Sequence, residues 1–416
     1  MTKTNHTVFF PGLNSLRFFA AFAVLLTHVE FTKKLLGHGE GLWVDFHQRG
    51  AVTAFHACMQ GKMAWLAPIL SMLGELGVVF FFVLSGFLIT YLLLKERDVK
   101  GKISVGKFYA RRLLRIWPLY LLVVLLGFFV LPRLEPFEIF QQQRYLWYGF
   151  WAQFVLYVAM LPNLSFAHFN IAIPNIGQAW SIGVEEQFYL IWPWLVSWFK
   201  NVGSMVVFFV ACLIGLKVIV SVCPDGIFEW LPTVKRFLGM TKMECMAIGA
   251  YGAFAVYHQR QRFMDLVYRP WVQIAAVAAI VPIVYFTPIA LMPLMHLYVS
   301  VVFLIIILNV ATNPKSILKL RFHWLDFLGR ISYGIYMYHM MIITLVIYLV
   351  KGRIKGFEQL TAWENILVYT ISTGLTILVA SLSYRYFETP WMKMKDRFTT
   401  IVSGEAARNN KGNNHV

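Results

Sequence analysis

Long apolar runs separated by short polar and basic segments fill the chain. A membrane-spanning helix needs about 20 largely apolar residues, and eleven runs approach this length. They lie at residues 8–31, 75–94, 113–132, 145–162, 180–199, 204–223, 240–257, 270–288, 291–311, 327–350 and 364–387. The pattern predicts an all-α fold, a polytopic membrane helix bundle.

The basic segments between the runs predict how the helices are oriented. Lys and Arg are concentrated at 95–115, 258–269, 313–323 and 393–397, and such segments stay on the cytoplasmic side. Five runs lie between the first two segments, so one of the five is expected not to cross. The run 145–162 is the shortest and has polar flanks, which favours a re-entrant or interfacial element. We therefore expect about ten crossings, with both termini in the cytoplasm.

The composition agrees with lipid as the main solvent. Hydrophobic residues make up 59% of the 416 residues and charged ones only 14%, which is more apolar surface than one soluble core buries. The net charge of +17 would suit nucleic acid, but the cations lie in loops between apolar runs. No nucleic-acid partner is therefore expected. The cysteines and loop histidines show no metal-ligand spacing, so no metal is expected either.

A single membrane-embedded domain is expected over residues 1–398, followed by a disordered cytoplasmic tail at 399–416. The sequence shows no cleavable signal peptide, linker or repeat, and no appended soluble domain is expected. All candidate chemistry should therefore lie among the membrane helices.

Ionisable side chains interrupt two of the runs. Arg17 and His28 are eleven positions apart, which returns to within about 20° of one helical face and about 16 Å along the axis. Such groups usually face the bundle interior and mark a substrate path or a proton step. For His28 the alternative is an interfacial histidine bonded to a neighbour. For His339, in the run 327–350, a hydrogen bond to a nearby tyrosine is the default interpretation.

Arginines mark the cytoplasmic ends of two runs. Arg111, Arg112 and Arg115 open one of them, and a guanidinium fork can grip phosphate bidentately. A cluster that only orients the helix is the alternative. At the end of the last run, Arg385 and Glu388 are spaced i, i+3, which predicts a structural ion pair.

Two adjacent carboxylates, Glu185 and Glu186, lie inside the run 180–199. Ser181, Glu185 and Tyr189 recur every four residues and should line one stripe of a helix, whereas Glu186 points about 100° away. Buried carboxylates must pair, become protonated or take part in chemistry. A structural ion pair is the alternative for at least one of them.

Six motifs, in this order, resemble the acyltransferase-3 family of integral membrane acyltransferases over residues 12–391. They are Arg17 with ten residues before His28, FFVLSGFLI (81–89), FYARRLLRI (108–116), WSIGVEEQFYL (180–190), ISYGIYMYH (331–339) and SYRYFETP (383–390). One departure is that Gly77-Val78-Val79 stands where the family often has Gly-Val-Asp.

The resemblance implies an enzyme of the bacterial cytoplasmic membrane. Its donor would be an acyl-CoA, most often acetyl-CoA, and its acceptor a hydroxyl of a saccharide in the cell envelope. The resemblance implies that His28 is catalytic, that Arg17 is required, and that Arg111, Arg112 and Arg115 dock the donor. The residues within the motifs that are expected to line the site are Ser85, Trp180, Ser181, Tyr189, Tyr338 and His339.

The roles expected of these residues leave alternatives open. His28 is expected to act as general base on the acceptor hydroxyl, or to carry the acyl group transiently. Glu185 or Glu186 is expected to orient the imidazole or to bind sugar hydroxyls. A transporter or flippase would also place charges inside the membrane, and a non-catalytic receptor or scaffold is a third class.

Overall fold

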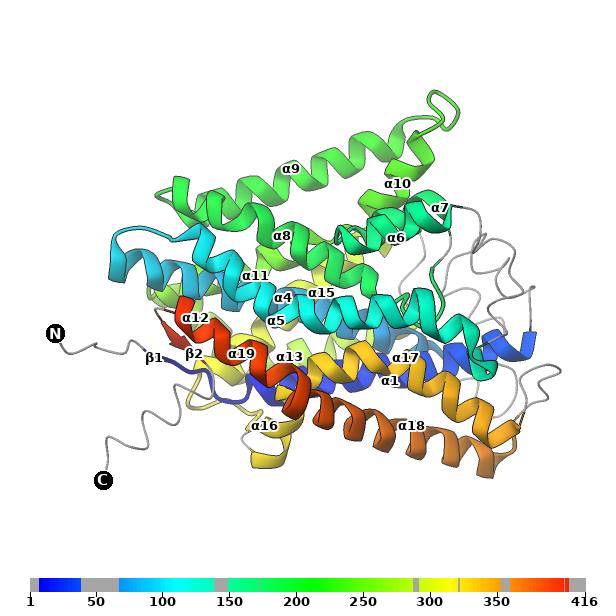
Figure 1. Cartoon of the computed structure of the whole chain (residues 1–416). Coiled ribbons are helices and arrows are strands. Elements are labelled where there is room, and N and C mark those ends of the chain that lie inside the picture. Colours follow the sequence, from blue (N-terminus) through cyan, green and yellow to red (C-terminus); the bar gives the residue numbers. More distant parts are fainter. Residues whose placement is uncertain are drawn as a thin grey trace.

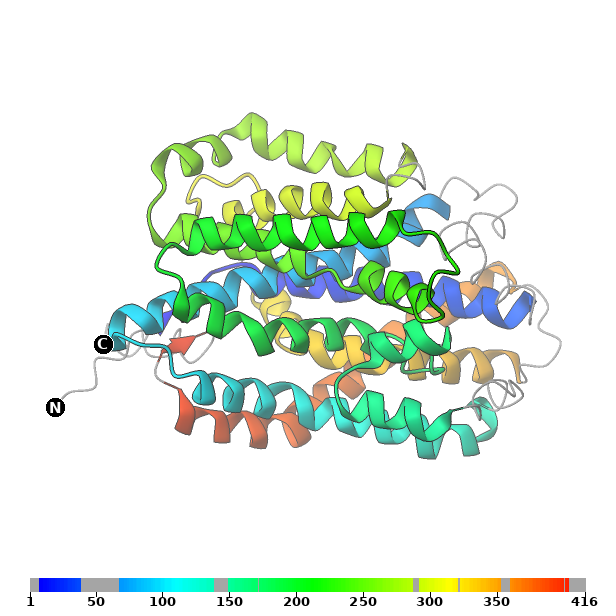
Figure 2. The same cartoon turned by 90° about the horizontal axis from the view of Figure 1, so that it is seen from above.

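The computed structural model describes residues 7–38, 67–137, 149–170, 172–286, 292–320, 322–352, 360–399 and 401–403. Within these residues the long helices run side by side in a bundle, as two perpendicular views show (Figure 1 and Figure 2). The only strands among the described residues are β1 (Thr7–Val8) and β2 (Val402–Ser403), which form one parallel pair. The predicted all-α bundle is confirmed.

Nine of the described helices form the body of the bundle. They are α1 (Leu13–His38), α4 (Ala67–Lys100), α5 (Val105–Leu125), α8 (Ala179–Trp198), α9 (Val202–Val222), α11 (Met243–Tyr257), α15 (Met292–Thr312), α17 (Ser332–Lys351) and α18 (Ala362–Ser383). Shorter helices connect or flank them. They are α6 (Phe150–Val158), α7 (Pro162–Phe169), α10 (Leu231–Met240), α12 (Gln261–Val267), α13 (Pro270–Ala278), α14 (Ile280–Phe286), α16 (His323–Arg330) and α19 (Thr389–Lys395).

Two of the long helices end in a wider turn. The π-helical turn Leu126–Val130 continues α5 and is followed by a 3-10 turn at Leu131–Arg133. The π-helical turn Tyr384–Glu388 joins α18 to α19, after which a 3-10 turn covers Asp396–Phe398. Such turns break the regular helical spacing of side chains.

Seven of the described helices are long and apolar enough to cross a membrane, or eight if a bent pair counts as one span. The pair joins α12 to the segment Pro270–Ile283 at 61°. The other two predicted crossings, 180–199 and 240–257, contain α8 and α11, which are not among these helices. Helix α8 carries two glutamates, and α11 has only 15 residues. Each predicted crossing therefore contains a helix. The run 145–162 holds only the nine-residue α6, which is shorter than a crossing needs.

The two described ends of the chain meet at one end of the bundle (Figure 1). Thr7 pairs with Val402 and Val8 with Ser403. An even number of crossings has this result, because it returns the chain to the side from which it started. The predicted disordered tail begins at 399, but β2 falls within it, and residues 404–416 lie outside the described part of the chain.

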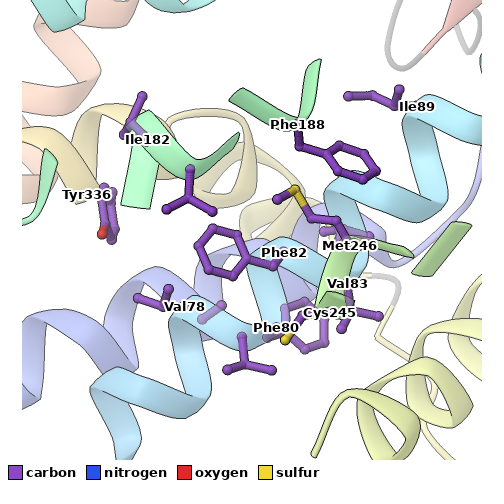
Figure 3. Packing of buried hydrophobic residues seen from close by; sticks show 14 of the residues in the cluster. Val78, Phe80, Phe82, Val83, Ile89, Ile182, Phe188, Cys245, Met246 and Tyr336 are labelled. Carbon is purple, nitrogen blue, oxygen red and sulfur yellow. The ribbon is translucent and has the colours of Figure 1, made fainter. Parts of the chain in front are cut away.

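Helix α4 is at the centre of the packing, in contact with α1, α8, α11 and α15. Its closest approach is to α11, where a Cβ on Gly86 would lie 1.8 Å from the Met246 carbonyl oxygen and one on Gly249 would lie 1.9 Å from that of Val83. Small residues allow two membrane helices to approach this closely. Buried side chains of α4, α8 and α11, among them Phe82, fill the space around the contact (Figure 3).

Replacing the contact glycine should loosen the bundle. We expect Gly249→Ala to destabilise the protein by about 1–3 kcal/mol, because the added methyl group overlaps the α4 backbone. Gly374→Ala in α18 is the matched control, since a Cβ there meets nothing within 4 Å. Thermal unfolding of the detergent-solubilised protein, followed by tryptophan fluorescence, compares them. Equal stability of the two variants would show that the contact is not tight.

Candidate active site

A cavity of about 120 Å³ lies inside the bundle, between α1, α4, α5, α8 and the region where α16 meets α17. Polar and apolar side chains both line it. They are Arg17, Val78, Phe81, Phe82, Ser85, Leu88, Ile89, Arg112, Arg115, Ile116, Ser181, Ile182, Glu185, Tyr189, Arg330, Ser332, Tyr333 and Tyr336. Arg17, Ser85, Arg112, Arg115, Ser181, Glu185 and Tyr189, all expected from the sequence, thus meet around one space.

The cavity is strongly cationic. Four arginines line it, whereas Glu185 is the one carboxylate among the described lining residues. Arg17 is held in place from its own helix, because its Nη1 donates to Asn14 Oδ1 at 3.0 Å. Asn14 Nδ2 in turn donates to Asp326 Oδ1 of α16 at 3.0 Å. An excess of fixed positive charge in a membrane-embedded cavity suits an anionic ligand.

Arg112 lines the cavity and carries a buried hydrogen-bond donor, its Nε. Its Nε is buried and has no hydrogen-bond partner among the described residues. The guanidinium lies 5.7 Å from the Phe108 ring centre and 5.8 Å from that of Tyr189, where cation–π attraction holds it. Buried donors are nearly always hydrogen-bonded, so a ligand anion is a natural partner for this group.

Arg111 is separated from the other two arginines of its motif. Its Nη2 lies 2.9 Å from Glu96 Oε2, in an ion pair with a carboxylate that is almost completely buried. Its Nη1 donates to the Phe398 carbonyl at 2.9 Å. Arg112 and Arg115 line the cavity, but Arg111 does not. The sequence motif alone did not reveal this ion pair.

The two adjacent glutamates have different surroundings. Glu185 faces the cavity and accepts a hydrogen bond from Ser85 Oγ at 2.5 Å. Glu186 does not line the cavity, and its Oε2 accepts from Trp117 Nε1 at 3.2 Å. The predicted stripe of Ser181, Glu185 and Tyr189 therefore faces the cavity, with Glu186 turned away.

His28 contacts the second membrane histidine, His339. Nδ1 of His28 lies 3.1 Å from Nε2 of His339, and 2.9 Å from the Val24 carbonyl oxygen. Nδ1 of His339 lies 2.6 Å from the carbonyl oxygen of Tyr336. The hydrogen bond predicted between His339 and a nearby tyrosine is thus made to the tyrosine's backbone carbonyl. His339 also contacts the imidazole of His28, a role that the sequence led us to expect of Glu185 or Glu186.

These contacts assign the tautomers of the neutral pair. A carbonyl only accepts, so Nδ1 of His339 carries the hydrogen and its Nε2 is left as an acceptor. Nδ1 of His28 then donates to both Val24 O and His339. Nε2 of His28 keeps its lone pair, which is the state that a general base requires.

Tyr336 connects the histidine pair to the cavity. Its backbone carbonyl holds His339, while its hydroxyl lies 2.6 Å from Ser181 Oγ and donates to the Gln178 carbonyl at 3.0 Å. Its ring lines the cavity, whereas His28 does not. The helical rise separates His28 from Arg17 by about 16 Å along α1, so His28 lies further from the start of this helix than Arg17 does.

The remaining expected site residues lie outside the cavity. The ring of Trp180 packs against Phe82 with centroids 6.3 Å apart. The hydroxyl of Tyr338 donates to Ser383 Oγ at 3.1 Å, and Ser383 donates to Glu388 Oε1 at the same distance. Neither Trp180 nor Tyr338 contributes to the cavity lining.

The predicted Arg385–Glu388 ion pair is wrong. Arg385 lies over the ring of Tyr386, 5.4 Å from its centre, and Glu388 accepts from Ser383 instead. Both residues belong to the π-helical turn Tyr384–Glu388. The wider turn changes the angle between positions i and i+3, so the spacing of a regular α-helix does not apply there.

Four of the polar lining residues were not selected from the sequence. They are Arg330, Ser332, Tyr333 and Tyr336. All belong to or adjoin the ISYGIYMYH motif, in which a polar residue follows nearly every apolar one. Tyr333 also ties α17 to α5, because its hydroxyl donates to the Ile116 carbonyl at 2.9 Å. Their concentration within one motif was the available signal.

Comparison with known proteins finds O-acetyltransferases among the relatives of this chain. O-acetyltransferase OatA of Staphylococcus aureus is 27% identical over 402 residues, covering 92% of this chain and 57% of that protein. Peptidoglycan O-acetyltransferase OatA of Listeria monocytogenes is 28% identical over 344 residues, covering 77% and 51%. A putative O-acetyltransferase of S. aureus is 29% identical over 338 residues, covering 77% and 53%. The chain thus spans little more than half the length of these relatives.

No solved structure matches the chain. The sequence model of a family described as "acyltransferase domain" matches residues 10–385, which include the cavity, both histidines and all three motif arginines. Because this match covers nearly the whole membrane bundle, the chain belongs to the acyltransferase-3 family.

Proposed function

We propose that the chain is a membrane O-acetyltransferase that moves an acetyl group from acetyl-CoA to a hydroxyl of a cell-envelope glycan. The cationic cavity is the observation that carries the proposal, because acetyl-CoA is an anionic acyl donor. The names of the relatives support acetyl transfer to oxygen, and that of the Listeria protein supports a peptidoglycan-like acceptor. The proposed location is the bacterial cytoplasmic membrane.

The donor site consists of Arg17, Arg112 and Arg115, whose guanidinium groups bind the phosphates of CoA. Arg17 and Arg112 lie near the beginnings of α1 and α5, and β1 directly precedes α1. We assign this end of the bundle to the cytoplasm, where acyl-CoA is made, which places both chain termini there. Arg111 is omitted from the donor site because it is held by Glu96.

The uncharged arm of the donor extends from the arginines toward His28, over a rise of about 16 Å along α1. Nε2 of His28 removes the proton from the acceptor hydroxyl while its oxygen attacks the thioester carbonyl. A carbon–oxygen bond forms and the carbon–sulfur bond breaks. The proton then passes from His28 to the departing sulfur, so that CoA leaves as the thiol. His339 positions the imidazole throughout.

Loss of the base should abolish transfer without unfolding the bundle. We expect His28→Asn to lower the rate of acetyl transfer by about 10²–10⁴-fold, which is the usual contribution of a general base. His339→Gln, which weakens only the positioning contact, should lower it by about two- to tenfold, the worth of one hydrogen bond. The rate is measured as thiol release from acetyl-CoA in membranes that contain the protein.

Mass spectrometry of the envelope glycans gives the second readout. A lost acetyl ester is expected in cells that carry His28→Asn, with the protein present at normal levels. Near-full transfer by this variant would exclude the mechanism. Movement of a glycan across the membrane without thiol release would favour the transporter or flippase alternative.

Two neighbouring arginines provide a sharp test of the donor site. Arg112→Gln should weaken acetyl-CoA binding by about ten- to hundredfold, because it removes hydrogen bonds between charged groups. Arg111→Gln is the control on the same helix and should leave donor affinity unchanged while losing the ion pair with Glu96. Binding of radiolabelled acetyl-CoA to protein in nanodiscs measures both. An equal effect of the two substitutions would assign the cluster to membrane orientation instead.

A further inference from the structure

A second group of ionisable side chains lies inside the bundle, apart from the arginines and His28. Glu75 of α4 forms an ion pair with Lys242, the residue directly before α11. Nε2 of His296, in α15, lies 3.5 Å from the same Oε1 of Glu75. Three helices that are far apart in sequence therefore bring their polar groups together, and we call these three residues the Glu75 cluster.

The Glu75 cluster is costly to bury. The side chains of Lys242, His296 and Glu75 are only 7%, 14% and 27% exposed. Nδ1 of His296 is buried and has no hydrogen-bond partner among the described residues. A buried ion pair seldom stabilises a protein more than apolar side chains of the same size. Ionisable groups at such positions in a membrane protein therefore point to function.

The Glu75 cluster borders the cavity. The Lys242 ammonium lies 5.4 Å from the centre of the Trp180 ring. The next residue, Ser181, faces the cavity and is hydrogen-bonded to Tyr336. Two adjacent residues at the start of α8 therefore face two different polar regions. Trp180 contacts the Glu75 cluster, and Ser181 lines the cationic cavity.

The depth of the Glu75 cluster matches that of His28. Thr27, the neighbour of His28, donates to the Leu70 carbonyl of α4 at 2.7 Å, so the first turns of α4 lie beside His28. Glu75 follows within this region. Ser85, on the cavity, is ten residues further along α4, or about 15 Å. The Glu75 cluster therefore lies toward the base and away from the donor arginines.

We propose that Glu75, Lys242 and His296, with the indole of Trp180 as an apolar wall, bind the acceptor sugar. This inference rests on the proposed function and adds to it the residues that select the acceptor. The carboxylate accepts hydrogen bonds from sugar hydroxyls and the ammonium donates them. Nε2 of His296 faces Glu75, so its Nδ1 is left as a further acceptor. Because Glu75 and Lys242 neutralise each other, the subsite suits an uncharged, hydroxyl-rich ring, unlike the cationic cavity.

The test is a titration of acceptor at saturating acetyl-CoA. The probe is envelope glycan from the source bacterium, stripped of its esters by mild alkali, and the readout is thiol release. His296→Gln keeps the ion pair, and the double variant Glu75→Gln/Lys242→Met removes both charges together. We expect each to raise KM for the glycan by at least about tenfold, as loss of hydrogen bonds to charged groups does. Acetyl-CoA affinity and kcat should stay at wild-type values.

The neighbouring ion pair between Lys217 and Glu244, at 2.6 Å, supplies the matched control. The double variant Lys217→Met/Glu244→Gln should change thermal stability but leave KM for the glycan unchanged. The acceptor subsite is overturned if His296→Gln and the Glu75→Gln/Lys242→Met variant keep the wild-type KM. A rise in KM of equal size in the control would overturn it too. Failure of the wild-type protein to esterify the glycan would instead refute the proposed function itself.

Discussion

Hydrocarbon offers no hydrogen-bond partner to a charged group, so ionisable side chains inside the bundle depend on other groups of the protein for one, and several of them find it on a neighbouring helix. The Ser85–Glu185 hydrogen bond joins α4 to α8, and the contact between His28 and His339 joins α1 to α17. The Glu75–Lys242 ion pair joins α4 to the start of α11. The polar groups that we assign to function are thus also contacts between helices.

Helix α4 links these contacts to the packing of the bundle. It carries Glu75 near its beginning and Ser85 ten residues later, and it packs against both α1 and α11. Gly86 directly follows Ser85, and its lack of a side chain allows the α11 backbone to approach. The same approach brings Lys242 within reach of Glu75. Close packing by small residues therefore sets the distances on which the polar contacts depend.

The spacing of residues in the sequence was sufficient to predict features that lie within a single helix. The helices at the ten predicted crossings were indicated by apolar runs, and the shared face of Ser181, Glu185 and Tyr189 follows from the helical repeat. Contacts between helices were not predictable in this way. His28 and His339 are 311 residues apart, and no periodicity within either run indicates the partner. The Glu75 cluster was not predictable for the same reason, because in the sequence each of its three members is an isolated polar residue.

Two further differences between the prediction and the structure have local causes, which the regular repeat of an α-helix does not include. The π-helical turn before α19 rotates Glu388 away from Arg385, and Glu96 holds Arg111 apart from its neighbours. A motif of three arginines therefore contains two kinds of residue, one engaged by the protein and two facing a cavity. Sequence resemblance treats all three alike, and only the geometry separates them.

The division between a cationic cavity and a neutral histidine pair suits a donor with two unlike parts. In the proposed reaction the phosphates stay with the arginines near the end of the bundle, because carrying them deeper would place charge in a low-dielectric interior. The thioester and its arm are uncharged and can extend to the base without this cost. Acetyl thus reaches His28 as a neutral group, and the acceptor hydroxyl meets it there. The free-energy cost of burying charge therefore gives a physical reason why Arg17 of the proposed donor site and the proposed base His28 lie on one helix but about 16 Å apart.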